Sequence, residues 1–390
     1  MSPKINSKAT LATLLLSSFA STALAASSCV AFDSNFNLLA FNYGGKDYDA
    51  GTQDSWGSGT PNDITASGRP KFDTDGVTCY LAQFYNAIYV LNADKSNPSS
   101  IYIYDAGAKS WSTQSVGSGG PDMTSAVSIL DHDTNVFYTM SQSKLWALNM
   151  DNLKTKASDA AISWESVGNP NFKADGYQPV MGLASNHIHF LNTAGAGKAN
   201  IFVIHFSYWQ PEIQSYSGGE FPAQHGQTAS IFKAEGWQTE FAFIPDDGSS
   251  TYVINVDNNS TQTLAGPPAK DSSALYATSI TALVSSSSQS GIQFLPYTAG
   301  SDNSGAKWSK VQKLANLTPA SSSGSSSGNT TGSSAGGKPT GTGSSAGSQS
   351  TGNSSSAGAN AGNGAVKAGK TAILGMFGAL VLGSIGVMLI

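Results

Sequence analysis

The chain has 390 residues, of which 12% are charged, and a formal net charge of −5 at pH 7. Its one arginine is Arg69, and its two cysteines are Cys29 and Cys79. Nucleic-acid binding depends on many Lys and Arg contacts to phosphate, so this sparse and mildly acidic charge excludes a nucleic-acid partner. The chain is long enough to bury a substantial core without several disulfides.

Residues 1–25 have the pattern of a secretory signal peptide. Two lysines precede an apolar run over residues 11–20, and the small-residue cleavage site Ala23-Leu24-Ala25 follows. This order of basic, apolar and small residues is typical of a segment that is removed on secretion. The apolar run is too short to cross ~30 Å of hydrocarbon as a helix. We therefore expect an extracellular mature chain that starts near Ala26.

Residues 26–317 are predicted to form one all-β domain built from repeats. A mostly apolar five-residue pattern recurs as LLAFN (38–42), IYIYD (101–105), LWALN (145–149), IFVIH (201–205), TYVIN (251–255) and IQFLP (292–296). The last five copies start 44, 56, 50 and 41 residues apart. A period of about fifty residues with several short strand-like runs in each unit indicates a repeat architecture.

The clearest unit shows what one repeat contains. The runs GVTCYLA, AIYVLN, SIYIYD and SWSTQSV follow one another between residues 76 and 116. Four antiparallel strands in one repeat describe a β-propeller blade, whereas a β-sandwich has no reason to repeat. Five blades are clear, and residues 29–59 read as an incomplete first blade, so we predict a β-propeller of five or six blades.

The blades resemble kelch repeats. In residues 88–116, an apolar strand, a second strand that ends in Asp and a downstream Trp occur at kelch-like spacing. No Gly-Gly pair follows the second strand, which is a departure from the kelch pattern. The resemblance implies a divergent kelch-like propeller, and it raises the secreted copper-radical oxidases as a related enzyme class.

Cys29 and Cys79 are expected to form a disulfide bond with each other. Both lie in the secreted part of the chain, where an oxidising compartment favours pairing. The alternative is two free thiols, one of which a copper-radical oxidase would need for a cross-link to tyrosine.

No catalytic residue, metal site or cofactor is predicted. The chain has five histidines, and His187 and His189 alternate along one predicted strand, so both would face one side. A histidine on a strand is more often half-buried than bound to a metal, so we expect no metal here. Asp73 and Asp75 are expected to be turn residues. No carboxylate pair for glycoside hydrolysis stands out from the turn aspartates.

Residues 318–362 are predicted to form a disordered stalk rich in Ser, Thr and Gly. They contain one lysine and no aromatic residue, so they cannot bury enough apolar surface to fold. Their Ser and Thr density suits O-glycosylation. Sequons for N-glycosylation occur at Asn258, Asn259, Asn316, Asn329 and Asn353.

Residues 363–390 are predicted to be a GPI signal. The apolar tail at residues 372–390 is long enough to span a bilayer, but no lysine or arginine follows it. Small residues at 360–362 and a polar spacer precede the tail, as a GPI signal requires. We expect lipid attachment at Asn360, with Asn363 as the alternative site. A retained transmembrane helix is the competing interpretation.

The expected function is binding rather than catalysis. Tyr208 and Trp209, in the loop-like segment HFSYWQPEIQSYSGGEF (205–221), are the ligand contacts that we expect. The protein would be a glycoprotein at the cell surface, GPI-anchored to the plasma membrane or cell wall, that displays its propeller to a wall glycan or a protein partner. This plan resembles that of fungal wall and plasma-membrane proteins. The alternative is a surface-tethered carbohydrate-active enzyme, either a glycoside hydrolase or a copper-radical oxidase.

Overall fold

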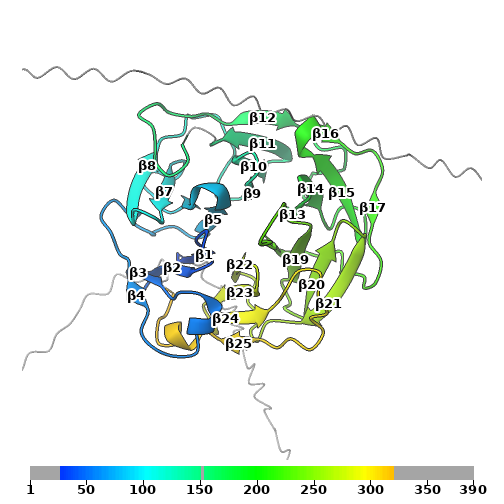
Figure 1. Cartoon of the computed structure of the whole chain (residues 1–390). Coiled ribbons are helices and arrows are strands. Elements are labelled where there is room, and N and C mark those ends of the chain that lie inside the picture. Colours follow the sequence, from blue (N-terminus) through cyan, green and yellow to red (C-terminus); the bar gives the residue numbers. More distant parts are fainter. Residues whose placement is uncertain (1–26, 151–152, 320–390) are drawn as a thin grey trace, which may run out of the picture. The chain divides into compact units, whose positions relative to one another are not determined.

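The computed structural model describes residues 27–150 and 153–319. These residues form six antiparallel β-sheets around a central axis (Figure 1). Helical structure in the described part is limited to four 3₁₀ turns: η1 (Gln53–Ser55), η2 (Gln83–Tyr85), η3 (Ile204–Phe206) and η4 (Gln312–Leu314). The fold is therefore a β-propeller, as the repeat pattern predicted, and of the five or six blades expected it has six. The predicted signal peptide, the predicted GPI signal and all but residues 318 and 319 of the predicted stalk lie outside the described residues.

Each blade is a meander of four strands that are hydrogen-bonded in chain order, and blade 4 has a fifth strand, β17, paired with β15. Blades 1 and 2 contain β1 (Cys29–Phe32), β2 (Leu38–Tyr43), β3 (Lys46–Asp49), β4 (Asn62–Asp63), β5 (Thr78–Ala82), β6 (Ala87–Leu91), β7 (Ile101–Asp105) and β8 (Ser110–Gln114). Blades 3 and 4 contain β9 (Val127–Asp131), β10 (Val136–Ser141), β11 (Lys144–Asn149), β12 (Glu165–Gly168), β13 (Met181–Ala184), β14 (His187–Phe190), β15 (Lys198–Val203), β16 (Tyr208–Trp209) and β17 (Gln214–Ser215). Blades 5 and 6 contain β18 (Gly226–Ser230), β19 (Glu240–Pro245), β20 (Ser250–Asn255), β21 (Ser260–Ala265), β22 (Leu275–Thr278), β23 (Ala282–Ser287), β24 (Gly291–Pro296) and β25 (Ser309–Lys310).

The first strands of the blades form a closed ring around the axis. Contacts run from β1 to β5, β9, β13, β18 and β22 in turn, and β22 returns to β1. These six strands run in the same direction, so the propeller has two distinct ends. We call the end where they begin the N-face and the end where they finish the C-face. Connections between the first and second strands and between the third and fourth strands of a blade therefore lie on the C-face, and all others lie on the N-face.

Apolar side chains fill the spaces between neighbouring blades. Tyr89 of blade 2 and Phe137 of blade 3 are fully buried, with ring centroids 5.9 Å apart. Between blades 4 and 5, Gly182 leaves room for the ring of Phe241, because a Cβ at position 182 would come within 2.4 Å of that ring. Burial of large aromatic groups on this scale supplies most of the stability of such a domain.

The ring closes without a blade shared between the two ends of the chain. Blade 1 uses only N-terminal strands, and blade 6 uses only the last four strands. The segment after β25 crosses to blade 1, where Lys313 N donates to Trp56 O (3.1 Å) and Gly44 N donates to Thr318 O (3.0 Å). Pro319 forms an isolated bridge with Tyr43. The described chain therefore ends on the N-face, next to the turn between β2 and β3.

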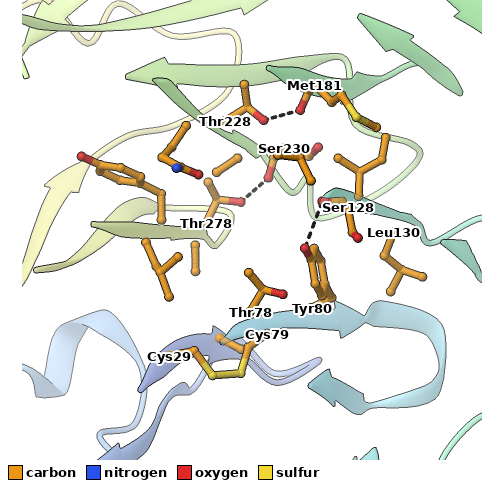
Figure 2. Close-up of a pocket in the computed structure, with 18 of the residues that line it drawn as sticks. Cys29, Thr78, Cys79, Tyr80, Ser128, Leu130, Met181, Thr228, Ser230 and Thr278 are labelled. Atoms are coloured by element: carbon orange, nitrogen blue, oxygen red, sulfur yellow. Dashed lines mark hydrogen bonds between the residues drawn. A yellow bond between two sulfur atoms is a disulfide. The ribbon is translucent and has the colours of Figure 1, made fainter. Parts of the chain in front are cut away.

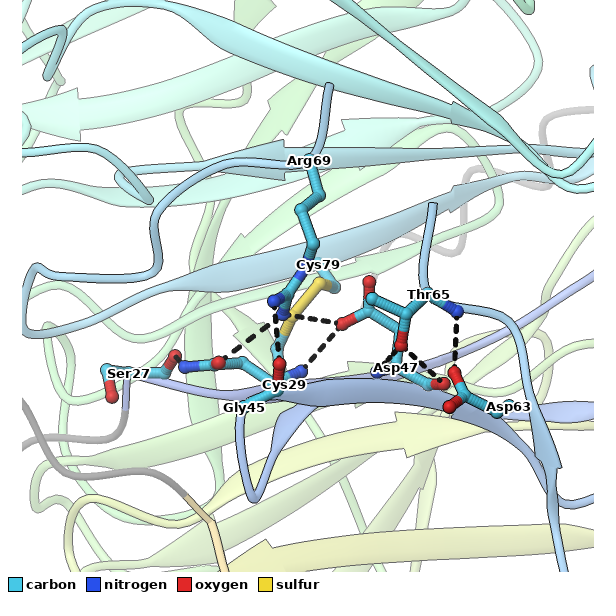
Figure 3. A network of polar contacts seen from close by, with 9 residues as sticks. Ser27, Cys29, Gly45, Asp47, Asp63, Thr65, Arg69 and Cys79 are labelled. Carbon is cyan, nitrogen blue, oxygen red and sulfur yellow. Dashed lines mark hydrogen bonds and ion pairs between the residues drawn. A yellow bond between two sulfur atoms is a disulfide. The ribbon is translucent and has the colours of Figure 1, made fainter. Parts of the chain in front are cut away.

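Arg69 holds together three N-face segments (Figure 3). Its guanidinium donates to Gly45 O (2.9 Å) and to the buried carboxylate of Asp47 (2.8 Å). Asn42 Nδ2 in the same network donates to Ser27 O (2.9 Å). Burial raises the pKa of Asp47, and the adjacent Arg69 opposes that effect. The network joins the N-terminal residue of the described chain, the β2–β3 turn and the connection from blade 1 to blade 2.

Two local expectations differ from the structure. The first blade, expected to be incomplete, has four strands; its third and fourth strands, KDYD and ND, are short and polar, so they lack the apolar repeat pattern. The segment 205–221, expected to be a loop, contains the short strands β16 and β17.

None of the helical turns in residues 27–150 and 153–319 has the length and apolar character of a membrane-spanning helix.

Candidate functional site

A cavity of about 340 Å³ lies on the axis of the propeller. The first strands of all six blades line this axial cavity, and Figure 2 shows many of the residues involved. Its lining, taken over the described residues, contains no Asp, Glu, Lys or Arg, and its two histidines are His132 and His225. Its volume lies at the lower end of the ~300–1,000 Å³ typical of ligand pockets.

Hydroxyl groups join neighbouring first strands around the axial cavity. The bonds from Thr228 to Met181 O, from Thr278 to Ser230 O and from Tyr80 to Ser128 O are drawn in Figure 2. A fourth bond runs from Ser230 to Leu183 O. A first strand has a ladder partner on only one side, so its other edge needs partners for its carbonyls. Each hydroxyl that donates in this way keeps its oxygen lone pairs as acceptors. The wall of the cavity is therefore lined with hydrogen-bond acceptors.

The predicted disulfide is confirmed. Cys29 and Cys79 are bonded to each other and join the first strands of blades 1 and 2 in the lining of the cavity (Figure 2). Since the sequence has only these two cysteines, no thiol remains for a cross-link to tyrosine.

Aromatic side chains close the C-face end of the cavity. Phe232, from the connection 231–239 of blade 5, reaches Phe36 of blade 1 (6.1 Å between ring centroids) and His132 of blade 3 (6.0 Å). Phe84 of blade 2 lies against the other side of His132 (5.9 Å). Burial lowers the pKa of His132 below its ordinary value. Phe232 therefore forms a floor that joins the three alternate blades 1, 3 and 5.

A histidine–carboxylate pair lies at the N-face end of the cavity. His225 Nδ1 lies 2.7 Å from Asp246 Oδ2, and both side chains are partly exposed. A ring with its proton on Nδ1 donates to this carboxylate, and the carboxylate then fixes the orientation of the imidazole. This pair is the arrangement at the cavity that most resembles acid–base machinery.

Four large aromatic side chains are exposed on the C-face. They are Phe84 (62% exposed), Phe206 (82%), Tyr208 (51%) and Trp237 (55%). Phe84 and Phe206 lie in the 3₁₀ turns η2 and η3, Tyr208 begins β16, and Trp237 lies in the connection 231–239. Ile213 is the one other exposed large hydrophobic residue in the described part of the chain. Exposed aromatic surface is thus concentrated on one end of the propeller.

The two predicted ligand contacts occupy different environments. Tyr208 is exposed, whereas Trp209 packs against Phe202 (5.0 Å between ring centroids), Phe190 (5.1 Å) and Phe172 (5.8 Å). The indole of Trp209 therefore fills the outer core of blade 4. Tyr208 is the member of the pair that is available to a ligand.

His187 and His189 do share one face of β14, with ring centroids 6.4 Å apart. His187 Nδ1 contacts Ser185 O, and His189 Nδ1 lies 2.6 Å from the hydroxyl of Tyr216. Both rings are thus engaged with protein groups. Among the described residues, no group of three or more His, Cys, Asp or Glu is placed to hold a metal ion.

The sequons in the described part are on the surface. Asn258 and Asn259 are exposed in the β20–β21 turn on the C-face, and Asn316 is exposed near the N-face. Asn329, Asn353 and the two lipid-attachment candidates, Asn360 and Asn363, lie outside the described residues.

Sequence reasoning identified Tyr208, and Phe206 lies in the same segment 205–221, but it gave no role to Phe84 or Trp237. Phe84 lies in the turn QFYN (83–86), and Trp237 lies in the connection 231–239. The available signal was an aromatic side chain inside a short polar turn. Phe232 had no such signal, because its role depends on a contact across the axis.

The fold and the site define the class as a six-bladed β-propeller with an axial cavity. No protein-family model matches the sequence, and no curated protein sequence matches it. Among solved structures, a chain of the nidogen–laminin complex has a TM-score of 0.41 and 12% identity, over 64% of this chain and 82% of that chain. Hsv2p of Kluyveromyces lactis has a TM-score of 0.38 and 12% identity, over 71% of this chain and 75% of that chain.

Proposed function

We propose that the protein is an extracellular binding module that recognises a neutral glycan through the C-face of its propeller. The observation that carries this proposal is the exposure of Phe84, Phe206, Tyr208 and Trp237 on a single face. Single exposed apolar residues are normal, but their concentration on one face marks an interaction site. Flat aromatic rings can pack against the C–H faces of sugar rings, and Trp and Tyr are enriched in binding hot spots.

The charge of the three C-face segments that carry or adjoin the exposed aromatics favours a neutral ligand. The segments QFYN (83–86), IHFS (204–207) and IFKAEGWQT (231–239) contain one lysine, Lys233, and one glutamate, Glu235. An anionic ligand would call for an excess of Lys and Arg at its site. A neutral wall glycan therefore fits this surface better than an acidic polymer.

The position of the C-terminal end of the described chain supports display at a surface. Pro319 pairs with Tyr43 on the N-face, which is the face opposite the exposed aromatics. We propose that a signal peptide directs secretion and that a GPI lipid at Asn360 or Asn363 anchors the protein to the plasma membrane or cell wall. A tether that begins on the N-face would leave the C-face unobstructed. Release from cells by phosphatidylinositol-specific phospholipase C tests the anchor, and retention after treatment would contradict it.

The kelch-like and fungal-type character also belongs to this proposal. It rests on the apolar strand, Asp-terminated strand and Trp order in residues 88–116, and on the plan of signal, domain, stalk and lipid signal.

A glycan array tests the binding function. The propeller, residues 27–319, contains all five core clusters and is the form to display. We expect binding to neutral glycans that falls about tenfold in Trp237→Ala and in Phe206→Ala, since interface aromatics are typical hot spots. Ile213→Ala is the matched control, because Ile213 is exposed about as much as Trp237 (52% and 55%) but lies between β16 and β17. Exclusive binding to acidic glycans or to a protein, or equal loss in the control, would contradict the proposal.

The His225–Asp246 pair favours one alternative, a carbohydrate-active enzyme that uses His225 as a general base. Within this alternative, the copper-radical oxidase lacks a thiol, because Cys29 and Cys79 are bonded to each other. Turnover of a sugar substrate that is abolished in His225→Gln, with unchanged binding to the array, would establish the enzyme in place of the binding module.

A further inference from the structure

The axial cavity is open at one end and closed at the other. Connections on the N-face that lead into blades 2 to 6 all contribute to its lining, for example through Ala126, Pro179 and His225. Beyond the strand ends, the described C-face contributes only His132 and Phe232, which lie against each other. The cavity is therefore a blind pocket with its mouth on the N-face and an aromatic floor.

The lining of the pocket selects against charge. Moving a charged group out of water is costly unless a partner of opposite charge receives it. The described lining contains no carboxylate, ammonium or guanidinium group. The two histidines of the lining already lie against Asp246 and Asp133, so the pocket favours an uncharged occupant.

Four hydroxyl groups of the lining favour hydrogen-bond donors on a ligand. The hydroxyl protons of Thr228, Ser230 and Thr278 are donated to backbone carbonyls, so their oxygens face a ligand as acceptors. The hydroxyl of Tyr80 also donates its proton to a backbone carbonyl, that of Ser128 (2.9 Å). A compound with several hydroxyl groups can donate to this ring of acceptors.

The apolar groups of the lining complete the description. Side chains such as Leu81, Leu130 and Met181 alternate with the hydroxyls, and the ring of Phe232 forms the floor. A cyclic compound with a C–H face and a hydroxylated rim satisfies both kinds of group. The volume of about 340 Å³ limits such a compound to a single ring or little more.

We propose that the axial cavity is a binding site for a small uncharged cyclic polyhydroxy compound, such as a monosaccharide or cyclic polyol, that enters from the N-face. This site goes beyond the glycan-binding function proposed above, because it lies inside the ring and opens on the opposite face. Its ligand contacts none of the exposed C-face aromatics.

Titration of the purified secreted protein tests the site. The neutral probes are glucose, mannose, N-acetylglucosamine and myo-inositol. Glucuronate is the control, because it differs from glucose by a charged carboxylate. Saturation-transfer NMR and calorimetry measure the binding. We expect at least one neutral probe to bind with one-to-one stoichiometry. Glucuronate should bind at least about tenfold more weakly than that probe, because its carboxylate would be buried without a partner.

Two variants place the binding in the cavity. Ala126→Trp fills the mouth and should abolish binding, whereas Ala108→Trp, in the exposed β7–β8 turn, should not change it. Thr228→Val removes one acceptor and should weaken binding about fivefold, with Thr113→Val on the outer strand β8 as its control. Thermal unfolding shows whether each variant is folded. If Thr228→Val does not fold, Ala126→Trp alone tests the site.

The outcomes separate this site from the proposed glycan surface. Loss of binding in Ala126→Trp with retention in Trp237→Ala supports the axial site whether or not the C-face binds glycans. The proposal is overturned if no neutral probe binds the wild-type protein, if glucuronate binds as well as glucose, or if Ala126→Trp binds as Ala108→Trp does.

Discussion

The two faces of the propeller are organised by different kinds of contact. On the N-face, buried aspartates bond across the chain: Asp47 to Arg69, Asp94 to Lys71 and Asp271 to Ser287, at separations of 22, 23 and 16 residues. On the C-face, the buried aspartates bond within their own turns, as Asp33 does with Asn37 and Asp131 with Thr134, at separations of 4 and 3 residues.

This difference indicates that the N-face connections stabilise the propeller through long-range bonds, whereas the C-face turns do not. Long-range bonds to buried carboxylates fix the long N-face connections against one another, because breaking any of them would leave a buried charge. Burial opposes the ionisation of Asp94, but hydrogen bonds from Tyr102, Asn97 and Ser96 outweigh it and hold its pKa below the usual range. Glu240 is the long-range exception near the C-face, where it accepts from Tyr297 (2.7 Å). The C-face aromatics are carried on short turns that need no such bracing.

The largest expected effect comes from the disulfide near the N-face. Replacing both Cys29 and Cys79 with Ser should lower the free energy of unfolding by about 4 kcal/mol, since the bond closes a loop of 50 residues in the unfolded chain. Urea denaturation measures this loss. The wild-type protein under reducing conditions is the control and should behave like the double variant. A loss below about 1 kcal/mol would show that the other N-face contacts suffice.

The next effect concerns Arg69. Arg69→Ala should cost about 3 kcal/mol, because it leaves the buried carboxylate of Asp47 without its cation. Adding Asp47→Asn should recover part of that loss. Lys46→Ala, which breaks the exposed pair with Asp63, is the matched control and should show no measurable change. Equal urea midpoints for the Arg69 and Lys46 variants would remove the distinction between a braced N-face and an ordinary charged surface.

A pair of tryptophans tests the C-face. Trp209→Ala should cost about 2–3 kcal/mol, because its indole packs against three phenylalanine rings. Trp237→Ala should change stability by less than about 0.5 kcal/mol, because its side chain is exposed. Thermal or urea unfolding of the two variants measures the contrast. A large loss in Trp237→Ala would mean that the C-face aromatics are structural.

The smallest expected effect depends on pH and concerns His189, which lies within strand β14 and not on either face. Burial lowers the pKa of His189 to about 3 in the folded protein, whereas in the unfolded chain this histidine has its ordinary pKa of about 6.5. Below that pH the unfolded chain therefore binds one more proton than the folded protein does. Stability should therefore fall as the pH drops below about 6.5, by about 2 kcal/mol at pH 5. His189→Asn should flatten this dependence, while His205→Gln, which changes an exposed ring, should not. Identical pH profiles for the two variants would contradict this assignment.

The blades were predictable where the repeat was apolar. IYIYD at residues 101–105 is the third strand of blade 2, and TYVIN at 251–255 lies within the third strand of blade 5. In blade 1 the matching run LLAFN falls in the second strand, and the third strand is the polar KDYD, so that blade looked incomplete. The fold follows from period and pattern, but strands with few apolar residues form there only because their neighbours already define the sheet.

The candidate sites were less predictable, because they depend on convergence. Thr228 and Thr278 are ordinary strand residues until the ring brings their hydroxyls to neighbouring carbonyls. The contact of Phe232 with Phe36 joins residues of blades 5 and 1, which no local pattern encodes. The disulfide was predictable because only one pairing of two cysteines exists.

The closure between blades 6 and 1 also has a mechanical meaning. A force on the chain beyond Pro319 reaches the propeller first through the Tyr43–Pro319 bridge and the bond from Gly44 N to Thr318 O. The Lys313 contacts with Trp56 O and Ala50 O come next. No strand of blade 1 belongs to the C-terminal end of the chain, so tension would peel this short segment away before it pulled on any complete blade. In the proposed form anchored beyond Pro319, these contacts of residues 313–319 would carry the load first, and the buried Val311 and Leu314 would follow.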